Sequence, residues 1–199
     1  MSVAPFDFDV STTDWVVRNR AEPWTSMWQM VTVLGDTLTL TLVVIGVFVL
    51  AWLAGRIDLS VLIVVGSLLG WSLMVLLKHL FARERPPVAE RLIDIGGLSF
   101  PSGHAMLSTV ILGLATVICY RIYPWLRAHP AVLVLPPLVV VAIGLSRVYL
   151  GVHWFSDVIV GWSVGLGWLA VCLVAHAQIV RRLAQRRSGT KTTPVRADA

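Results

Sequence analysis

The sequence predicts an all-α integral membrane protein, a bundle of about five transmembrane helices with a short interfacial N-terminal segment. Composition favours this class, because 57% of the 199 residues are hydrophobic and only 14% are charged. The mean hydropathy is +0.80. Long charge-free runs give the second indication, since a helix needs about 20 apolar residues to cross a bilayer. A membrane β-barrel would instead show period-two alternation. The composition therefore excludes both an ordinary soluble domain and a disordered chain.

The elements follow in three parts along the chain. Residues 1–33 are polar and carry Trp15 and Trp24, so they are predicted to lie at the membrane interface as a surface helix or loop. Residues 34–180 form the transmembrane domain, and residues 181–199 are predicted to be a basic, disordered tail. The charge-free runs place the spanning helices at about 34–55, 59–79, 102–122, 131–149 and 156–180.

Orientation follows from the lysines and arginines, which favour cytoplasmic flanks. Both sides of the predicted bundle are basic. On one side the lysines and arginines lie close to histidines and a carboxylate, which indicates that they have a functional role besides setting the orientation. The tail has a dense cluster without such neighbours: Arg181, Arg182, Arg186, Arg187, Lys191 and Arg196. We therefore expect a multi-pass protein of the cell membrane, with the tail in the cytoplasm and the N-terminus outside.

Because neighbouring helices run in opposite directions, four helix boundaries are predicted to meet on the outer, extracytoplasmic face. They carry three cations, two imidazoles, a hydroxyl and a carboxylate: Lys78, Arg85, Ser102, His104, Arg147, His153 and Asp157. Ionisable residues at membrane depth are costly and by default functional. Lys and Arg donate to phosphate oxygens, and two of the helices begin at this face with their amides free. The set predicts an anion site.

Two short motifs refine this prediction. His153 and Asp157 lie four residues apart, one helical turn, so the carboxylate can orient the imidazole and leave its other nitrogen free. Such an arrangement suits a base or a nucleophile. In Pro101-Ser102-Gly103-His104, the glycine allows a backbone amide to approach a ligand closely. His104 has no carboxylate at a comparable spacing.

Three segments together resemble a known family. KHLFARERP at 78–86, PSGH at 101–104 and SRVYLGVHWFSD at 146–157 look like the three-part signature of the type 2 phosphatidic acid phosphatases. That superfamily also includes vanadium haloperoxidases and glucose-6-phosphatase. The three motifs occur in order with fitting gaps, which is far more specific than PSGH alone.

The resemblance implies a metal-independent phosphatase. It implies that His153 is the nucleophile, that Asp157 orients it and that His104 protonates the leaving oxygen. It implies that the phosphate is bound by Lys78, Arg85, Ser102, Gly103 and Arg147. Residues 34–180 would then be a lipid-phosphatase domain, with undecaprenyl diphosphate as the favoured substrate and phosphatidate or phosphatidylglycerophosphate as the second.

Other interpretations stay open beside this one. A channel or transporter would explain the spans but not the one-sided set of phosphate ligands, and a vanadate-dependent haloperoxidase would share the constellation. Zinc on the two histidines and Asp157 is disfavoured, because three cations would repel a divalent metal. We therefore expect no metal or other cofactor. The expected partners are a lipid phosphate and the bilayer, with no nucleic acid, and the oligomeric state is left open. Arg83 and Arg91 are interpreted as interfacial anchors.

Overall fold

The computed structural model describes residues 3–189, and this part of the chain forms α-helices and short 3-10 turns without a strand. Its main apolar helices are α3 (Thr37–Leu53), α4 (Ile57–Phe81), α5 (Gly103–Ile122), α7 (Leu135–Tyr149) and α8 (Phe155–Gly189). The five predicted spans correspond to these helices, with most boundaries shifted by only a few residues. The all-α membrane fold is therefore confirmed.

Four of the helical segments are long and apolar enough to cross a bilayer. Helix α3, with 17 residues, falls short alone, but α2 (Trp24–Val33) and α3 together pass the same test. These two helices meet at an angle of 45° across a short break, so the described chain has four spans, or five if the bent pair is one span. The break lies at Gly35 and Asp36.

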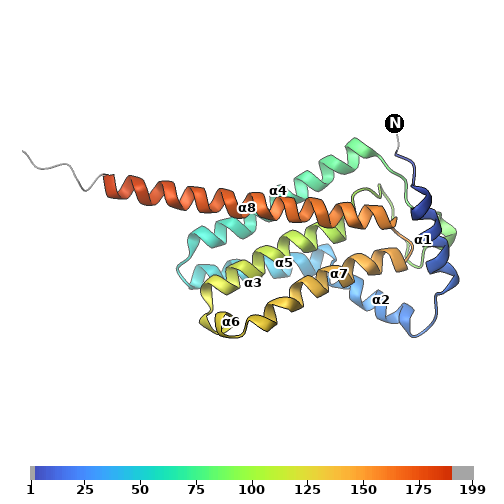
Figure 1. The fold of residues 1–199 in the computed structure, drawn as a ribbon, viewed down its shortest axis with the longest axis horizontal. Helices are drawn as coiled ribbons and strands as arrows, with labels where there is room; N and C mark the ends of the chain where they lie inside the picture. Colours follow the sequence, from blue (N-terminus) through green and yellow to red (C-terminus); the bar gives the residue numbers. More distant parts are fainter. Residues whose placement is uncertain (1–2, 190–199) are drawn as a thin grey trace, which may run out of the picture.

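The N-terminal segment covers one end of the bundle. Helix α1 (Asp7–Arg18) crosses that end and packs on α7 and α8, while α2 packs on α7 (Figure 1). Large apolar side chains are exposed here: Phe6 just before α1, and Phe8 and Trp15 within it. An amphipathic helix of this kind suits a membrane interface.

Helix α5 is the centre of the fold and packs against α3, α4, α7 and α8. Two glycines of α8 allow its close approach to α5. A Cβ at Gly161 would lie 2.8 Å from the carbonyl oxygen of Ser102, and one at Gly165 would lie 2.8 Å from Cβ of Thr109. Small residues allow such backbone approaches between membrane helices. The packing sets the beginnings of α5 and α8 side by side, where Ser102 N–H donates to the carbonyl of Asp157 at 3.0 Å.

The last helix is longer than expected. The sequence predicted its end near residue 180, but α8 continues to Gly189. The first nine residues of the expected disordered tail are therefore helical, because Arg181–Gln185 contain good helix formers and no Gly or Pro. The remainder of that predicted tail, residues 190–199, lies outside the described residues.

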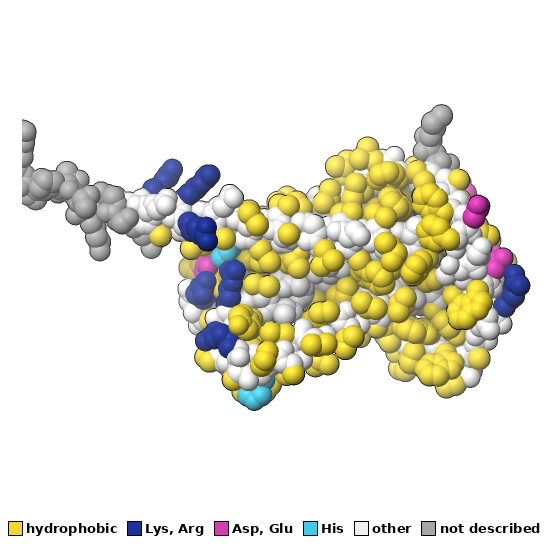
Figure 2. All heavy atoms as spheres, viewed as in Figure 1, with side chains coloured by type: hydrophobic (Ala, Val, Ile, Leu, Met, Phe, Trp, Pro, Cys, Tyr) yellow, Lys and Arg dark blue, Asp and Glu magenta, His cyan; other side chains and the backbone are white. Residues whose placement is uncertain are grey.

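The surface shows an apolar flank and a basic end. Figure 2 shows hydrophobic side chains over the sides of the helices, and Lys and Arg side chains gathered at the end from which α8 projects. The exposed arginines of that end include Arg121, Arg127, Arg181 and Arg182. Soluble proteins rarely expose such wide apolar surfaces. The arrangement is that of a multi-pass membrane protein.

Candidate active site

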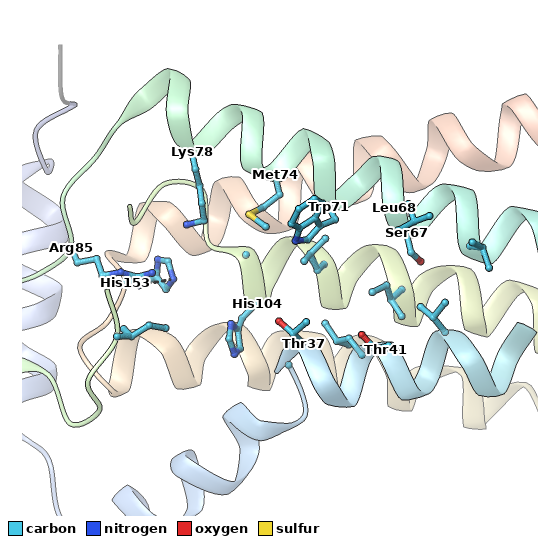
Figure 3. A pocket seen from close by; sticks show the side chains of 18 residues that line it. Thr37, Thr41, Ser67, Leu68, Trp71, Met74, Lys78, Arg85, His104 and His153 are labelled. Carbon is cyan, nitrogen blue, oxygen red and sulfur yellow. Dashed lines mark hydrogen bonds between the residues drawn. The ribbon is translucent and has the colours of Figure 1, made fainter. Parts of the chain in front are cut away.

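The site residues predicted from the sequence lie at the end of the bundle that α1 covers. A cavity of about 540 Å³ opens there between α3, α4 and α5. Its polar end is lined by residues from four separate segments: Lys78, Arg85, Gly103, His104 and His153 (Figure 3). Its remaining lining is mostly apolar. The predicted convergence of helix ends therefore occurs in the structure, while the role of each residue stays a prediction.

His153 lies in the short turn between α7 and α8 and is 2% exposed. Its Nδ1 lies 3.3 Å from Oδ2 of Asp157, one helical turn later. Its Nε2 lies 3.2 Å from Nη1 of Arg85, and since a guanidinium only donates, Nε2 must be the acceptor. The proton therefore sits on Nδ1 and faces the carboxylate, as in a histidine held by an orienting acid.

The ionisation of His153 follows from its surroundings. Burial lowers the pKa of His153 well below its usual range, and the nearby charges of Arg85, Arg147 and Lys78 lower it further. The ring is therefore neutral at pH 7, with an Nε2 lone pair beside the cavity. A neutral imidazole with an unprotonated ring nitrogen is what a nucleophile requires.

One cation near His153, Arg147, lacks partners for some of its donors. Arg147 is 1% exposed, and Nη1 donates to Oγ1 of Thr32 at 2.6 Å. Its Nε and Nη2 are buried without a hydrogen-bond partner among the described residues, and so is Oγ of Ser102. A buried guanidinium with unpaired donors costs several kcal/mol, and an anionic ligand can offset that cost. A phosphate would satisfy these donors.

Lys78 and Arg85 hold the loop that closes over this end. Lys78 Nζ donates to the carbonyl of Leu98 at 2.6 Å. Arg85 Nε donates to the carbonyls of Gly96 and Gly97 at 3.2 and 3.1 Å. Burial, together with the charge of Arg91, lowers the pKa of Arg85 to about 10, so this side chain stays cationic at neutral pH. Both cations keep donors for a ligand, since Lys has three and Arg has five.

Arg83 is not an interfacial anchor, and that interpretation was wrong. Its side chain is completely buried, and Nη1 donates to Oδ1 of Asp157 at 2.6 Å. Its Nη2 donates to Oδ2 of Asp9 at 2.7 Å. Arg91 is partly buried, and its Nε donates to the carbonyl of Pro86 at 2.8 Å. The anchor interpretation rested on the position of Arg83 at a helix end, but such an arginine is exposed only if no buried acid faces it.

Asp9 of α1 is the first member of a buried chain of side chains that continues through Arg83 and Asp157 to His153. It is fully buried and accepts from the backbone N–H of Ser156 at 2.8 Å and from its hydroxyl at 2.7 Å. Burial alone would raise the pKa of Asp9, but the hydrogen bonds from Ser156, Arg83 and Phe6 outweigh it and lower that pKa. Asp9 is therefore an anion that neutralises part of the Arg83 charge behind Asp157.

His104 has a carboxylate partner that is distant in the sequence. Its Nε2 lies 2.9 Å from Oδ1 of Asp36, the residue that precedes α3. Spacing could not reveal this pair, because the two residues are 68 positions apart. The only available signal was a lone carboxylate between Gly35 and a long apolar run.

The first 36 residues thus contact all three motifs. Asp9 binds Arg83, Thr32 binds Arg147 and Asp36 binds His104. Arg20 adds a fourth link, since its Nε donates to the carbonyl of Tyr149 at 3.0 Å and its Nη1 to that of Glu90 at 2.7 Å. Sequence reasoning missed all four contributions.

The fold and the site define a class: a multi-pass helical membrane protein with a histidine-based anion site at one end of its bundle. The chain belongs to the PAP2 superfamily, whose family model matches residues 58–181. The resemblance seen in the motifs is thereby confirmed. The contacts from the first 36 residues lie outside that match.

Similar proteins agree with this family. Phosphatidylglycerophosphatase B of Bacillus subtilis is 37% identical over 91 residues, which cover 45% of this chain and 44% of that protein. Decaprenylphosphoryl-5-phosphoribose phosphatase of Mycobacterium tuberculosis is 37% identical over 106 residues, which cover 50% and 51%. The chain therefore spans about half the length of the curated relatives it matches.

The similarity to a solved structure covers more of the chain than the similarity to these relatives does. The crystal structure of a transmembrane PAP2-type phosphatidylglycerolphosphate phosphatase from Bacillus subtilis matches with a TM-score of 0.81 at 25% identity. The match covers 86% of each chain. It therefore includes much of the bundle beyond the family-model residues.

Proposed function

We propose that this protein is a metal-independent phosphatase of lipid phosphates or diphosphates. The observation that carries the proposal is the buried guanidinium of Arg147, which has two unpaired donors close to a neutral, carboxylate-oriented His153. Unpaired buried donors favour the binding of an anion, and a neutral imidazole beside them can attack the bound anion. Family membership supports the same reaction class.

In the proposed mechanism, Nε2 of His153 attacks phosphorus and forms an N–P bond as the P–O bond to the lipid breaks. His104 gives its proton to the leaving oxygen. Asp157 stabilises the positive charge that builds on His153. A water molecule then attacks phosphorus, passes a proton to His104 and releases phosphate as the N–P bond breaks. Phosphoryl transfer of this kind depends mainly on positioning and charge stabilisation, which Lys78, Arg85 and Arg147 supply together with Ser102 and the Gly103 amide.

The shape of the cavity supports a lipid substrate. Away from the histidines its lining is mostly apolar and follows α3 and α4, with Leu40, Val44, Leu68 and Trp71 among its side chains. A phosphate at the polar end would leave a hydrocarbon chain along this apolar stretch. Undecaprenyl diphosphate remains the favoured substrate, and phosphatidate or phosphatidylglycerophosphate the second. One relative is named for a polyprenyl phosphate lipid and another for a glycerophospholipid, so both classes belong in the test.

The proposed orientation places the site on the extracytoplasmic face, α1 at the outer interface and the C-terminal residues in the cytoplasm. It is supported by the exposed arginines at the end opposite the site (Figure 2). Cysteine labelling tests it in a background lacking Cys119 and Cys172. Ala89→Cys, in the exposed loop after α4, should react with an impermeant thiol reagent in intact cells. Ser188→Cys should react only after permeabilisation, and the opposite pattern would invert the topology.

A panel of lipid phosphates tests the activity. Purified protein in detergent should release phosphate from at least one polyprenyl or glycerolipid substrate, and excess chelator should not abolish the release. Vanadate should inhibit, because its five-coordinate adduct on an imidazole resembles the transition state. If chelator abolishes the activity and magnesium or zinc restores it, the metal-free mechanism is contradicted. Bromide oxidation with vanadate, but no phosphate release, would favour the haloperoxidase alternative, and neither activity would favour a channel or transporter.

A further inference from the structure

The break between α2 and α3 holds one side of the His104 ring. A Cβ at Gly35 would lie 2.8 Å from Cδ2 of His104, so only a glycine leaves room for the ring here. The next residue, Asp36, places Oδ1 2.9 Å from Nε2 of the same ring. Two consecutive residues of the break therefore contact the edge of the imidazole that carries Cδ2 and Nε2.

The opposite edge of this ring carries Nδ1. Among the described residues, no hydrogen-bond partner contacts Nδ1 of His104, and the side chain lines the cavity together with Lys78 and His153 (Figure 3). The side chain is 18% exposed, so it is accessible from the cavity. A histidine with one nitrogen held by a carboxylate has its tautomer fixed by that bond.

We propose that Asp36 is a positioning residue for the reaction: it holds Nε2–H of His104, so that Nδ1 is the atom that delivers the proton to the leaving oxygen. This inference rests on the proposed phosphatase function and adds a residue outside the family-model match.

The protons balance in this arrangement. The protonated ring carries one proton on each nitrogen, with Nε2–H bound to Asp36 and Nδ1–H directed to the leaving oxygen. As the P–O bond breaks, the Nδ1 proton passes to that oxygen, and the neutral ring keeps its Nε2 proton on Asp36. The incoming water later returns a proton to Nδ1. Asp36 itself never becomes protonated.

The charges around His104 show why a carboxylate matters here. The charged groups near His104 include the guanidinium groups of Arg147 and Arg85 and the carboxylate of Asp36, and Lys78 lines the same cavity. Without Asp36, the protonated ring would lose the carboxylate that offsets these cations. Asp36 also differs from Asp157, because its side chain is 48% exposed and that of Asp157 is fully buried.

Asp36→Asn tests the proposal, since an amide keeps the size and an acceptor but loses the charge. For a lipid phosphate, whose leaving oxygen needs a proton, kcat/KM should fall about 10- to 100-fold, part of the 10²–10⁴-fold that general acids contribute. For para-nitrophenyl phosphate, whose leaving oxygen needs little protonation, the change should stay below about 3-fold. Asp94→Asn is the matched control, because Asp94 is exposed in the loop before α5. An equal loss on both substrates would overturn the proposal.

A double-mutant cycle separates this role from a general weakening of the fold. In a His104→Ala background, Asp36→Asn should cause no further loss on the lipid substrate, because the residue through which it acts is gone. Additive losses would show that Asp36 acts elsewhere, and would overturn the inference.

A spectroscopic measurement tests the inference without depending on turnover. With isotope-labelled histidine, the nitrogen resonances of His104, identified by their loss in His104→Gln, should report the Nε2–H tautomer at a pH where the ring of the otherwise unchanged protein is neutral. The Asp36→Ala variant should shift these resonances, while Asp94→Asn should not. An inactive protein with the expected tautomer would contradict the proposed function alone. A Nδ1–H tautomer in an active enzyme would contradict the role of Asp36 alone.

Discussion

The two ends of the bundle use the same residue types in opposite ways. At the end away from the site, Arg56 donates to both oxygens of Asp58 at 3.0 and 2.9 Å. His176 Nε2 lies 3.1 Å from Asp58, and its Nδ1 lies 3.2 Å from Nη1 of Arg121. Each of these groups has a partner, and together they join α4, α5 and α8.

At the site end, the cations outnumber the carboxylates that face them. Asp9 and Asp157 both bind Arg83, while Lys78, Arg85 and Arg147 form no ion pair within the described chain. A histidine beside an acid is therefore not diagnostic by itself, since both ends have one. The unpaired buried donors distinguish a ligand site from a structural brace.

Removing a histidine from each end should give the largest contrast. His153→Gln should lower turnover by more than about 10⁴-fold, because it removes the proposed nucleophile. His176→Gln, its matched control at the opposite end, should leave turnover within about 3-fold, since it loses only a local hydrogen bond. Phosphate release from the best lipid substrate measures both. Comparable losses in the two variants would remove the distinction between the ends.

The arginines should give the next largest contrast. Arg147→Met should lower kcat/KM by about 10²–10³-fold, the usual loss for a donor that stabilises transition-state charge. Its Tm should not fall, because the change removes a buried charge whose Nε and Nη2 have no partner. Arg121→Met at the other end should change neither quantity strongly, since Arg121 is exposed. A large drop in Tm for Arg147→Met would mean that Arg147 is mainly structural.

Asp9 should show a smaller effect on activity. Asp9→Asn leaves Arg83 with more uncompensated charge, so that Arg83 draws Asp157 away from His153. We expect about a 10-fold loss in kcat, as for other residues that orient an active-site ligand. Asp7→Asn on the exposed side of α1 is the control. If both variants match the unchanged protein, the buried chain from Asp9 to His153 has no catalytic role.

The smallest effect concerns stability and pH. The folded-state pKa of His153 is lowered by burial, then by Arg85, Arg147 and Lys78. Below about pH 6.5, the unfolded chain gains a proton at His153 that the folded protein excludes. The free energy of unfolding should therefore fall as pH falls, by at most about 1.4 kcal/mol per pH unit from this residue.

The variant His153→Gln should reduce that slope, whereas His129→Gln, an exposed control, should keep it. Unfolding midpoints between pH 7.5 and 5.0 measure the slope. Asp9 acts in a separate window, because its lowered pKa gives stability above about pH 3.8 that is lost only at more acidic pH. An unchanged slope in His153→Gln would show that His153 is not held neutral.

These two ends also show what sequence can and cannot predict. Helix alternation and one-turn spacing placed Lys78, His153 and Asp157 together, because those relations are local or topological. Asp9 and Asp36 were missed, since they reach their partners through tertiary packing across 74 and 68 residues. Arg83 lay inside a recognised motif, yet its burial depends on α1, which no local pattern connects to it.

The central claim is that His153 forms a covalent bond to phosphorus. Purified protein should be mixed with a radiolabelled lipid phosphate, quenched within milliseconds and divided between acid and alkaline conditions. We predict a label on the protein that acid removes and alkali preserves, as expected for phosphohistidine. It should map to the peptide containing residue 153 and be absent from His153→Gln. An active enzyme whose His153→Gln variant still acquires the label, or a label on His104, would contradict the account.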